Sequence, residues 1–122
     1  MLTGILCLVG LWMRSKPPVV EKPKHVSMSV VATAYTDHDP GCHPSKKTRN
    51  KYGNHIPGVA VDPRVIPLRS FVSYNRGKTW VLADDTGGAI KGRRIDIRMA
   101  SRRKAFEWGR RRITILLRKR EQ

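Results

Sequence analysis

Carboxylates are scarce in this chain, and four of them gather in its most strand-rich part. The 122 residues hold nine Asp and Glu against 25 Lys and Arg. A carboxylic acid can donate a proton to a leaving group and then, as a carboxylate, accept one, so it can catalyse bond cleavage. The sequence therefore places its candidate chemistry at four clustered aspartates: Asp62, Asp84, Asp85 and Asp96.

A glycine-rich turn lies between two of these carboxylates. It starts at Asp85 and runs through Thr86, Gly87 and Gly88 toward Lys91. Glycine lets the backbone approach a ligand closely and adopt positive φ, while Thr86 and free amides offer hydrogen bonds. We expect such a turn to suit a sugar or an oxyanion. The alternative is a structural turn stabilised by the aspartate, with no ligand.

The strand that follows predicts where Asp96 points. In the segment Ile95–Met99, side chains alternate between two faces, so Ile95 and Ile97 share one face and Asp96 and Arg98 the other. Asp96 is therefore expected to face a surface or a groove. Pairing of Asp96 with a neighbouring arginine is the structural alternative.

The rest of the chain predicts an all-β protein with one short helix. A helix capped by Ser101 and ended by Gly109 is expected near the C-terminus. A polar loop over residues 37–57 is long enough to border a binding cleft. Six short apolar runs bounded by turn residues are predicted strands: Ser29–Tyr35, Val59–Val61, Phe71–Tyr74, Trp80–Ala83, Ile95–Met99 and Ile113–Leu117.

The charge of the chain indicates an anionic partner. Its formal net charge is +16, which suits nucleic acid, membrane headgroups or the acidic polymers of a cell envelope. No helix-turn-helix, zinc-finger or RNA-recognition signature is present, which disfavours nucleic acid. The basic positions cluster near the C-terminus: Arg102, Arg103, Lys104, Arg110, Arg111, Arg112, Arg118, Lys119 and Arg120.

Composition predicts four regions. Residues 1–13 form an apolar run with the length of a signal-peptide core, which predicts export or a membrane anchor, with a buried helix or strand as the alternative. Residues 14–27 are expected to be a linker rich in Pro and Lys. Residues 28–118 are the predicted barrel or sandwich domain, and residues 119–122 a basic tail.

No metal or cofactor is predicted. The 37–57 loop holds histidines, aspartates and Cys42, but their spacing matches no established metal-binding pattern. Polar loop residues of this kind are mostly solvated. Cys42 has His43 beside it in sequence, which is not the spatial arrangement that a nucleophilic Cys-His pair needs.

Four ordered motifs together resemble the three-aspartate (3D) domain of bacterial cell-wall lytic enzymes. They cover most of residues 30 to 117. The resemblance implies a double-psi β-barrel, and it maps the family's aspartates onto Asp62, Asp85 and Asp96. The chain departs from the family pattern at Arg69-Ser70, where glycine and threonine are usual. The motifs are Thr33–Tyr35, Val59–Leu68, Ala83–Asp96 and Ala105–Arg111.

The resemblance also implies a lytic transglycosylase, a lyase that cuts peptidoglycan between N-acetylmuramic acid and N-acetylglucosamine and leaves a 1,6-anhydro end. Asp96 would act as general acid and then base, with Asp62 and Asp85 in support. If both lie near Asp96, their charge would raise its pKa, while Arg94 and Arg98 would lower it. The implied substrate-lining residues are Thr33, Tyr35, Thr86, Gly87, Gly88 and Lys91.

Two alternatives from another class remain open. A barrel can bind peptidoglycan or another anionic polymer without cutting it, because fold and ligand site can survive the loss of catalysis. Nucleic-acid binding through the basic surface is the second alternative. If the protein cuts or binds peptidoglycan, the expected partners are glycan strands and anionic wall polymers, and the expected location is the cell envelope.

Overall fold

Six strands and one short helix make up the described part of the chain. The computed structural model describes residues 25–119. All six expected strands and the helix are present, with ends that shift by a few residues. The expected segment 1–13 lies outside the described residues, as do most of the linker and of the basic tail. The elements are β1 (Val26–Tyr35), β2 (Gly58–Val61), β3 (Phe71–Ser73), β4 (Val81–Asp85), β5 (Arg94–Arg98), α2 (Arg102–Trp108) and β6 (Arg111–Arg118).

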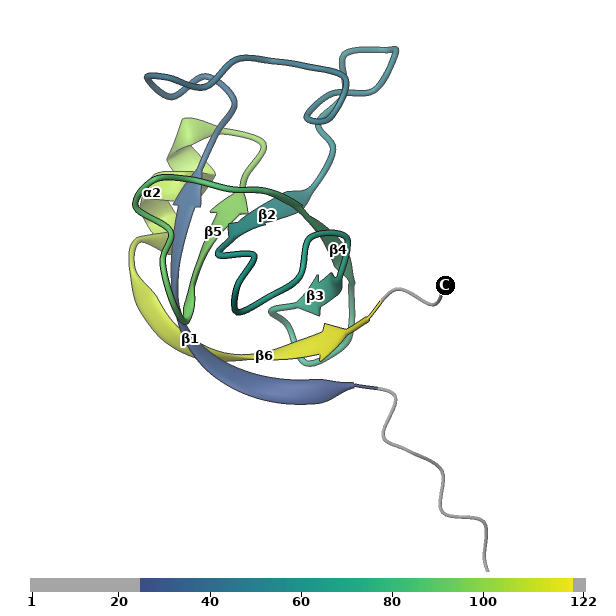
Figure 1. Ribbon diagram of the computed structural model, residues 1–122. Helices are drawn as coiled ribbons and strands as arrows, with labels where there is room; N and C mark the ends of the chain where they lie inside the picture. The colour runs from purple at the N-terminus through teal and green to yellow at the C-terminus, as the bar shows by residue number, and fades with distance from the viewer. Residues whose placement is uncertain (1–24, 120–122) are drawn as a thin grey trace, which may run out of the picture.

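The strands close into a barrel in the order β1-β5-β2-β4-β3-β6 (Figure 1). Two pairs are parallel, β1 with β5 and β2 with β4. The other four pairs are antiparallel. Closure leaves no unpaired sheet edge, which a sheet this small would otherwise expose to other chains. The prediction of a small all-β barrel with one short helix is confirmed.

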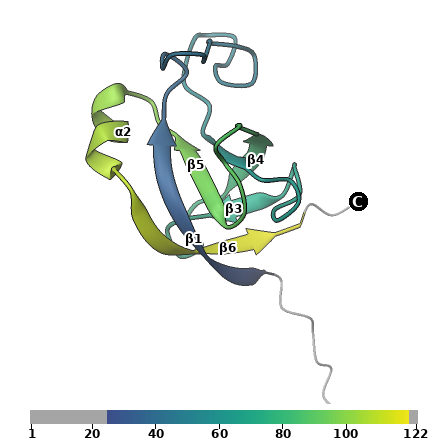
Figure 2. The ribbon, with the colours of Figure 1, turned by 60° about the vertical axis from the view of Figure 1, so that its left-hand side comes forward.

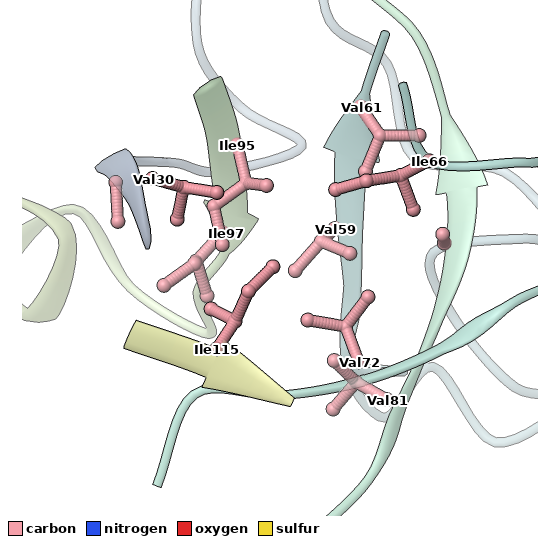
Figure 3. Close-up of a cluster of buried hydrophobic side chains, with 11 residues drawn as sticks. Val30, Val59, Val61, Ile66, Val72, Val81, Ile95, Ile97 and Ile115 are labelled. Carbon is pink, nitrogen blue, oxygen red and sulfur yellow. The ribbon is translucent and has the colours of Figure 1, made fainter. Parts of the chain in front are cut away.

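The interior of the barrel is filled by branched aliphatic side chains. Val30, Val59, Ile95, Ile97 and Ile115 are fully buried, and Figure 3 shows them pointing toward one another from different strands. β-Branched side chains pack well on a pleated sheet, so the same residues favour the strands and fill the core. The interior is therefore packed, and any ligand must bind outside it.

Helix α2 packs beside β1. Ser101 caps it by accepting a hydrogen bond from the Lys104 amide at 3.3 Å, and Gly109 ends it with φ 66°. Trp108 Nε1 donates to the Ala32 carbonyl of β1 at 3.3 Å. The predicted start and end of the helix are confirmed.

The long loop between β1 and β2 projects beyond one end of the barrel, near α2 (Figures 1 and 2). Its polar centre is Asp37, which is 4% exposed. Arg49 donates to Asp37 through Nε at 2.9 Å and Nη2 at 3.0 Å, and the Thr48 hydroxyl donates at 2.9 Å. Arg49 is the main reason that the pKa of Asp37 lies below its usual value. These hydrogen bonds give the loop a defined conformation, so its residues can take fixed positions in a site at its base.

Candidate functional site

A row of paired residues crosses four neighbouring strands on the outside of the barrel. Thr33 of β1 pairs with Asp96 of β5, Asp96 with Ala60 of β2, and Ala60 with Asp85 of β4. Paired residues share a face of the sheet. Their chain neighbours fill the core, so the row lies on the outer face. Three predicted site residues, Thr33, Asp85 and Asp96, are therefore brought together.

Asp85 joins this row because β4 contains a β-bulge. Val59 pairs with Ala83 but the next residue, Ala60, pairs with Asp85, so the register shifts by one. Strict alternation would turn Asp85 inward with Ala83, and the extra residue, Asp84, turns it outward instead. Sequence periodicity does not place this bulge. The doublet Asp84-Asp85 was its signal, since alternation would otherwise bury one of the two charges in an apolar core.

The environment of Asp96 shifts its carboxyl group toward the protonated form. Burial is the largest cause, and it raises the pKa of Asp96 above its usual value. The Thr33 hydroxyl, which donates to Oδ1 at 3.0 Å, and the charge of Arg94 act in the opposite direction. The negative charges of Asp39 and Asp85 add to the rise. The sequence left open whether the neighbours of Asp96 raise or lower its pKa, and in the structure the net effect is a raised pKa.

Asp85 is held as a carboxylate. Burial acts to raise its pKa, but hydrogen bonds outweigh it and lower the value. The donors are the Tyr35 hydroxyl at 2.9 Å, the Thr86 amide at 2.9 Å and the Lys47 ammonium at 3.2 Å. Burial also raises the pKa of Tyr35, so its hydroxyl stays protonated and can donate. Asp85 and Asp96 thus have pKa values pushed apart, the arrangement by which proteins separate an acid from an ionised partner.

Arg98 is buried. The sequence predicted that it would lower the pKa of Asp96, but in the structure it forms an ion pair with Asp84 instead. It lies on the outer face as expected, but the long loop covers it and it is 2% exposed. Its Nη1 and Nη2 donate to Asp84 at 3.0 and 2.8 Å, and Nη1 also donates to the Tyr35 hydroxyl at 3.3 Å. Its Nε donates to the Ile56 carbonyl of the loop at 3.0 Å. Arg98 therefore joins β4, Tyr35 and the loop at the base of the site.

Asp62 supports the turn before β5. It is 2% exposed, and it accepts hydrogen bonds from Arg64 Nη2 at 2.9 Å and from the Gly92 amide at 2.8 Å. These two partners, Arg64 first, lower its pKa. Gly87 and Gly88 do not use the positive φ that glycine permits, and in this turn only Gly92 has one, at 68°. Asp62 therefore stabilises the turn by accepting the hydrogen bond from Gly92, the residue with positive φ.

The other predicted lining residues lie along the same turn. Thr86, Gly88 and Lys91 are exposed. A Cβ on Gly88 would meet nothing within 4 Å, whereas one on Gly87 would lie 3.1 Å from Ile90 Cγ1. Gly87 is thus constrained by packing, and Gly88 leaves the backbone open to solvent.

Two hollows flank the row, and both include residues that the sequence did not predict. One, of about 470 Å³, is lined by Lys47, Arg69 and Asp84. The other, of about 600 Å³, lies against α2 and includes Thr33 and Asp39. Lys47 and Asp39 come from the long loop, where no local pattern distinguishes them from solvated loop residues.

The remaining surface is strongly basic. Within residues 25–119, no group of three or more His, Cys, Asp and Glu side chains is arranged to hold a metal ion. Cys42 is a free thiol, and burial raises its pKa, which disfavours the nucleophilic thiolate. None of the helices in the described range is long and apolar enough to cross a membrane. The predicted basic positions that are described are all exposed: Arg102, Arg103, Lys104, Arg110, Arg111, Arg112, Arg118 and Lys119.

Comparison with known proteins finds three similar chains in Bacillus subtilis (strain 168). The "Cell wall-binding protein YocH" is 46% identical over 85 residues, covering 67% of this chain and 29% of the relative. The "Putative cell wall shaping protein YabE" is 39% identical over 90 residues, covering 72% and 22%. The "SPbeta prophage-derived uncharacterized protein YorM" is 44% identical over 101 residues, covering 73% and 41%. The matched region thus spans less than half the length of each relative.

A family model for the 3D domain matches residues 58–117. The match runs from the first residue of β2 into β6, so it includes β4 with its bulge, β5 and α2. It contains Asp62, Asp85 and Asp96, the three aspartates that the resemblance assigned. Residues 58–117 of the chain therefore belong to the 3D domain family.

Proposed function

We propose that this protein is a lytic transglycosylase of the bacterial cell envelope, with Asp96 as its catalytic acid. One observation carries the proposal. Asp96 is half-buried with a raised pKa on the outer face of the barrel, in the same row as the ionised Asp85. The family, and relatives whose printed names refer to the cell wall, supply the substrate class.

The proposed reaction needs only one acid. Protonated Asp96 donates its proton to the glycosidic oxygen, and the bond to the anomeric carbon of N-acetylmuramic acid breaks. The Asp96 carboxylate then accepts the proton of the O6 hydroxyl of the same sugar, whose oxygen attacks the anomeric carbon. A 1,6-anhydro ring forms and no water is consumed, so no second catalytic carboxylate is required.

Asp85 has a supporting part in this scheme. Its backbone is two strands from that of Asp96, roughly 10 Å away at the usual strand spacing. At that separation it is not placed as a nucleophile, for which paired carboxyl groups lie about 5 Å apart. Its fixed negative charge instead favours the protonated form of Asp96 and stabilises the positive charge that develops at the anomeric carbon as the bond breaks.

Mass spectrometry of the soluble products tests the proposal directly. The full chain is incubated with purified peptidoglycan, alongside Asp96→Asn. A matched control is Glu107→Gln, which removes one negative charge from the exposed side of α2. We expect anhydromuropeptides from the parent and from Glu107→Gln, and none from Asp96→Asn. Products with only reducing ends would instead mean hydrolysis with water.

A second function is wall binding without cleavage. The exposed basic residues of α2 and β6 favour it, and so does the name of the relative called a cell wall-binding protein. Its signature is co-sedimentation with peptidoglycan that weakens steeply with salt and is unchanged in Asp96→Asn, because exposed charges are screened. Co-sedimentation without any cleavage product would favour this function.

A further inference from the structure

An exposed aromatic side chain borders the hollow beside α2. Phe106 is 88% exposed although it is large and apolar. It is not needed to hold its helix, because Trp108 attaches α2 to β1 through its hydrogen bond to Ala32 and packs edge-on against Tyr74 at 5.7 Å between ring centroids. Phe106 instead lines the hollow together with Thr33 and Asp39.

The polar groups of this hollow are held in place before any ligand binds. Asp39 accepts hydrogen bonds from the Thr36 hydroxyl at 2.8 Å and from the Thr36 amide at 3.2 Å. Arg102 lies across from it, with Nε 3.7 Å from Asp39 Oδ1, and donates through Nη2 to the His38 carbonyl at 3.3 Å. Groups that are already ordered bind a ligand with less loss of entropy.

The hollow lies directly beside Asp96. Thr33, part of its lining, donates the hydrogen bond to Asp96, and the two residues are neighbours on adjacent strands, about 4.8 Å apart in backbone spacing. Asp39 is also close enough for its charge to raise the pKa of Asp96. A molecule in the hollow is therefore next to the carboxyl group that performs the proposed chemistry.

We propose that this hollow is a sugar subsite in which Phe106 stacks on a pyranose ring and Asp39 and Arg102 bind its hydroxyl groups. An aromatic face with a few convergent polar groups is the chemistry that a pyranose needs, since the ring has one apolar face and a polar rim. The inference rests on the proposed function in one respect: the ring belongs to the glycan strand whose neighbouring bond is cut at Asp96.

Titration of the full chain with chitotetraose, followed by backbone amide NMR shifts, tests the subsite. The variants are Phe106→Ala, Phe106→Trp and the matched control Tyr52→Ala, which removes an aromatic side chain that is 75% exposed on the long loop. We expect Phe106→Ala to raise the Kd about 2- to 12-fold. Phe106→Trp and Tyr52→Ala should bind like the parent, and the shifts should centre on Asp39 and Phe106.

Three results would overturn the subsite. They are an unchanged Kd in Phe106→Ala, shifts that avoid the hollow, or self-association of the parent that Phe106→Ala abolishes in sedimentation velocity, which would make the hollow a contact between two copies.

Peptidoglycan cleavage measured in parallel separates this inference from the proposed function. Cleavage with an unchanged KM in Phe106→Ala would refute the subsite and keep the enzyme. Chitotetraose binding that depends on Phe106, without anhydro products, would keep the subsite and refute the enzyme.

Discussion

Replacing Arg98 by methionine should destabilise the barrel strongly. The Arg98 side chain is fully covered and that of Asp84 is 11% exposed. Methionine fills much of the same volume but leaves Asp84 without its partner in a poorly hydrated place. It also removes the donors to Tyr35 and to the Ile56 carbonyl.

The size of the effect follows from this burial. Removing one partner of a buried ion pair costs about 3–5 kcal/mol, because a charge is left uncompensated. Small domains have a total unfolding free energy of about 5–15 kcal/mol, so the loss is a large part of it. In thermal unfolding it corresponds to a fall in Tm of at least about 12 °C.

Urea unfolding of the full chain, followed by circular dichroism, measures the effect. Arg103→Met is the matched control, because the Arg103 side chain is 82% exposed and its ion pair with Glu107 should contribute at most about 1 kcal/mol. The double variant Arg98→Met/Asp84→Leu should recover most of the loss, since an apolar pair can replace a buried ion pair. A loss below about 1 kcal/mol in Arg98→Met, equal to that of the control, would refute the reasoning.

Three further variants test other parts of the structure. Burial raises the folded-state pKa of Asp96, so its stabilising contribution is complete below the unfolded value of 3.8 and is lost as pH rises through the folded value. Asp96→Asn should therefore be more stable than the parent at pH 7. Urea unfolding measured at several pH values would contradict this if the stability of the parent, relative to Asp96→Asn, rose between pH 3.8 and the raised folded-state pKa. Arg69 has φ 72°, so Arg69→Gly should gain about 0.5–1 kcal/mol by relieving left-handed strain; a lower Tm would show that the side chain itself stabilises the fold. In Gly58→Ala the new Cβ would overlap Arg98 Nη2 and lie 2.7 Å from Asp84 Oδ1, which should cost about 1–3 kcal/mol, whereas Gly88→Ala meets nothing within 4 Å and serves as the neutral control.

The departure from the family pattern at Arg69 has a visible consequence in the backbone. The 3D domain pattern usually has glycine where this chain has Arg69, and Arg69 adopts the left-handed backbone that glycine takes without strain. A side chain at this position therefore carries the strain of the left-handed backbone. The altered turn does not open the barrel, because the β2–β4 and β3–β4 pairs on either side of it are formed.

Local rules in the sequence determined the elements of this protein. Short apolar runs bounded by turn residues predicted all six strands, Ser101 and Gly109 predicted the limits of α2, and ordered motifs pointed to the family and to Asp96. These signals act over a few residues, where side-chain period, capping and turn chemistry decide the conformation.

Only the tertiary structure decided how the site is assembled. The hydrogen bond between Thr33 and Asp96 joins residues 63 positions apart, and the bulge that turns Asp85 outward depends on pairing between β2 and β4. The burial of Arg98 depends on where the long loop rests, and the raised pKa of Asp96 depends first on burial by distant segments. Register, burial and electrostatics are set by contacts between segments far apart in the chain, and no local pattern contains them.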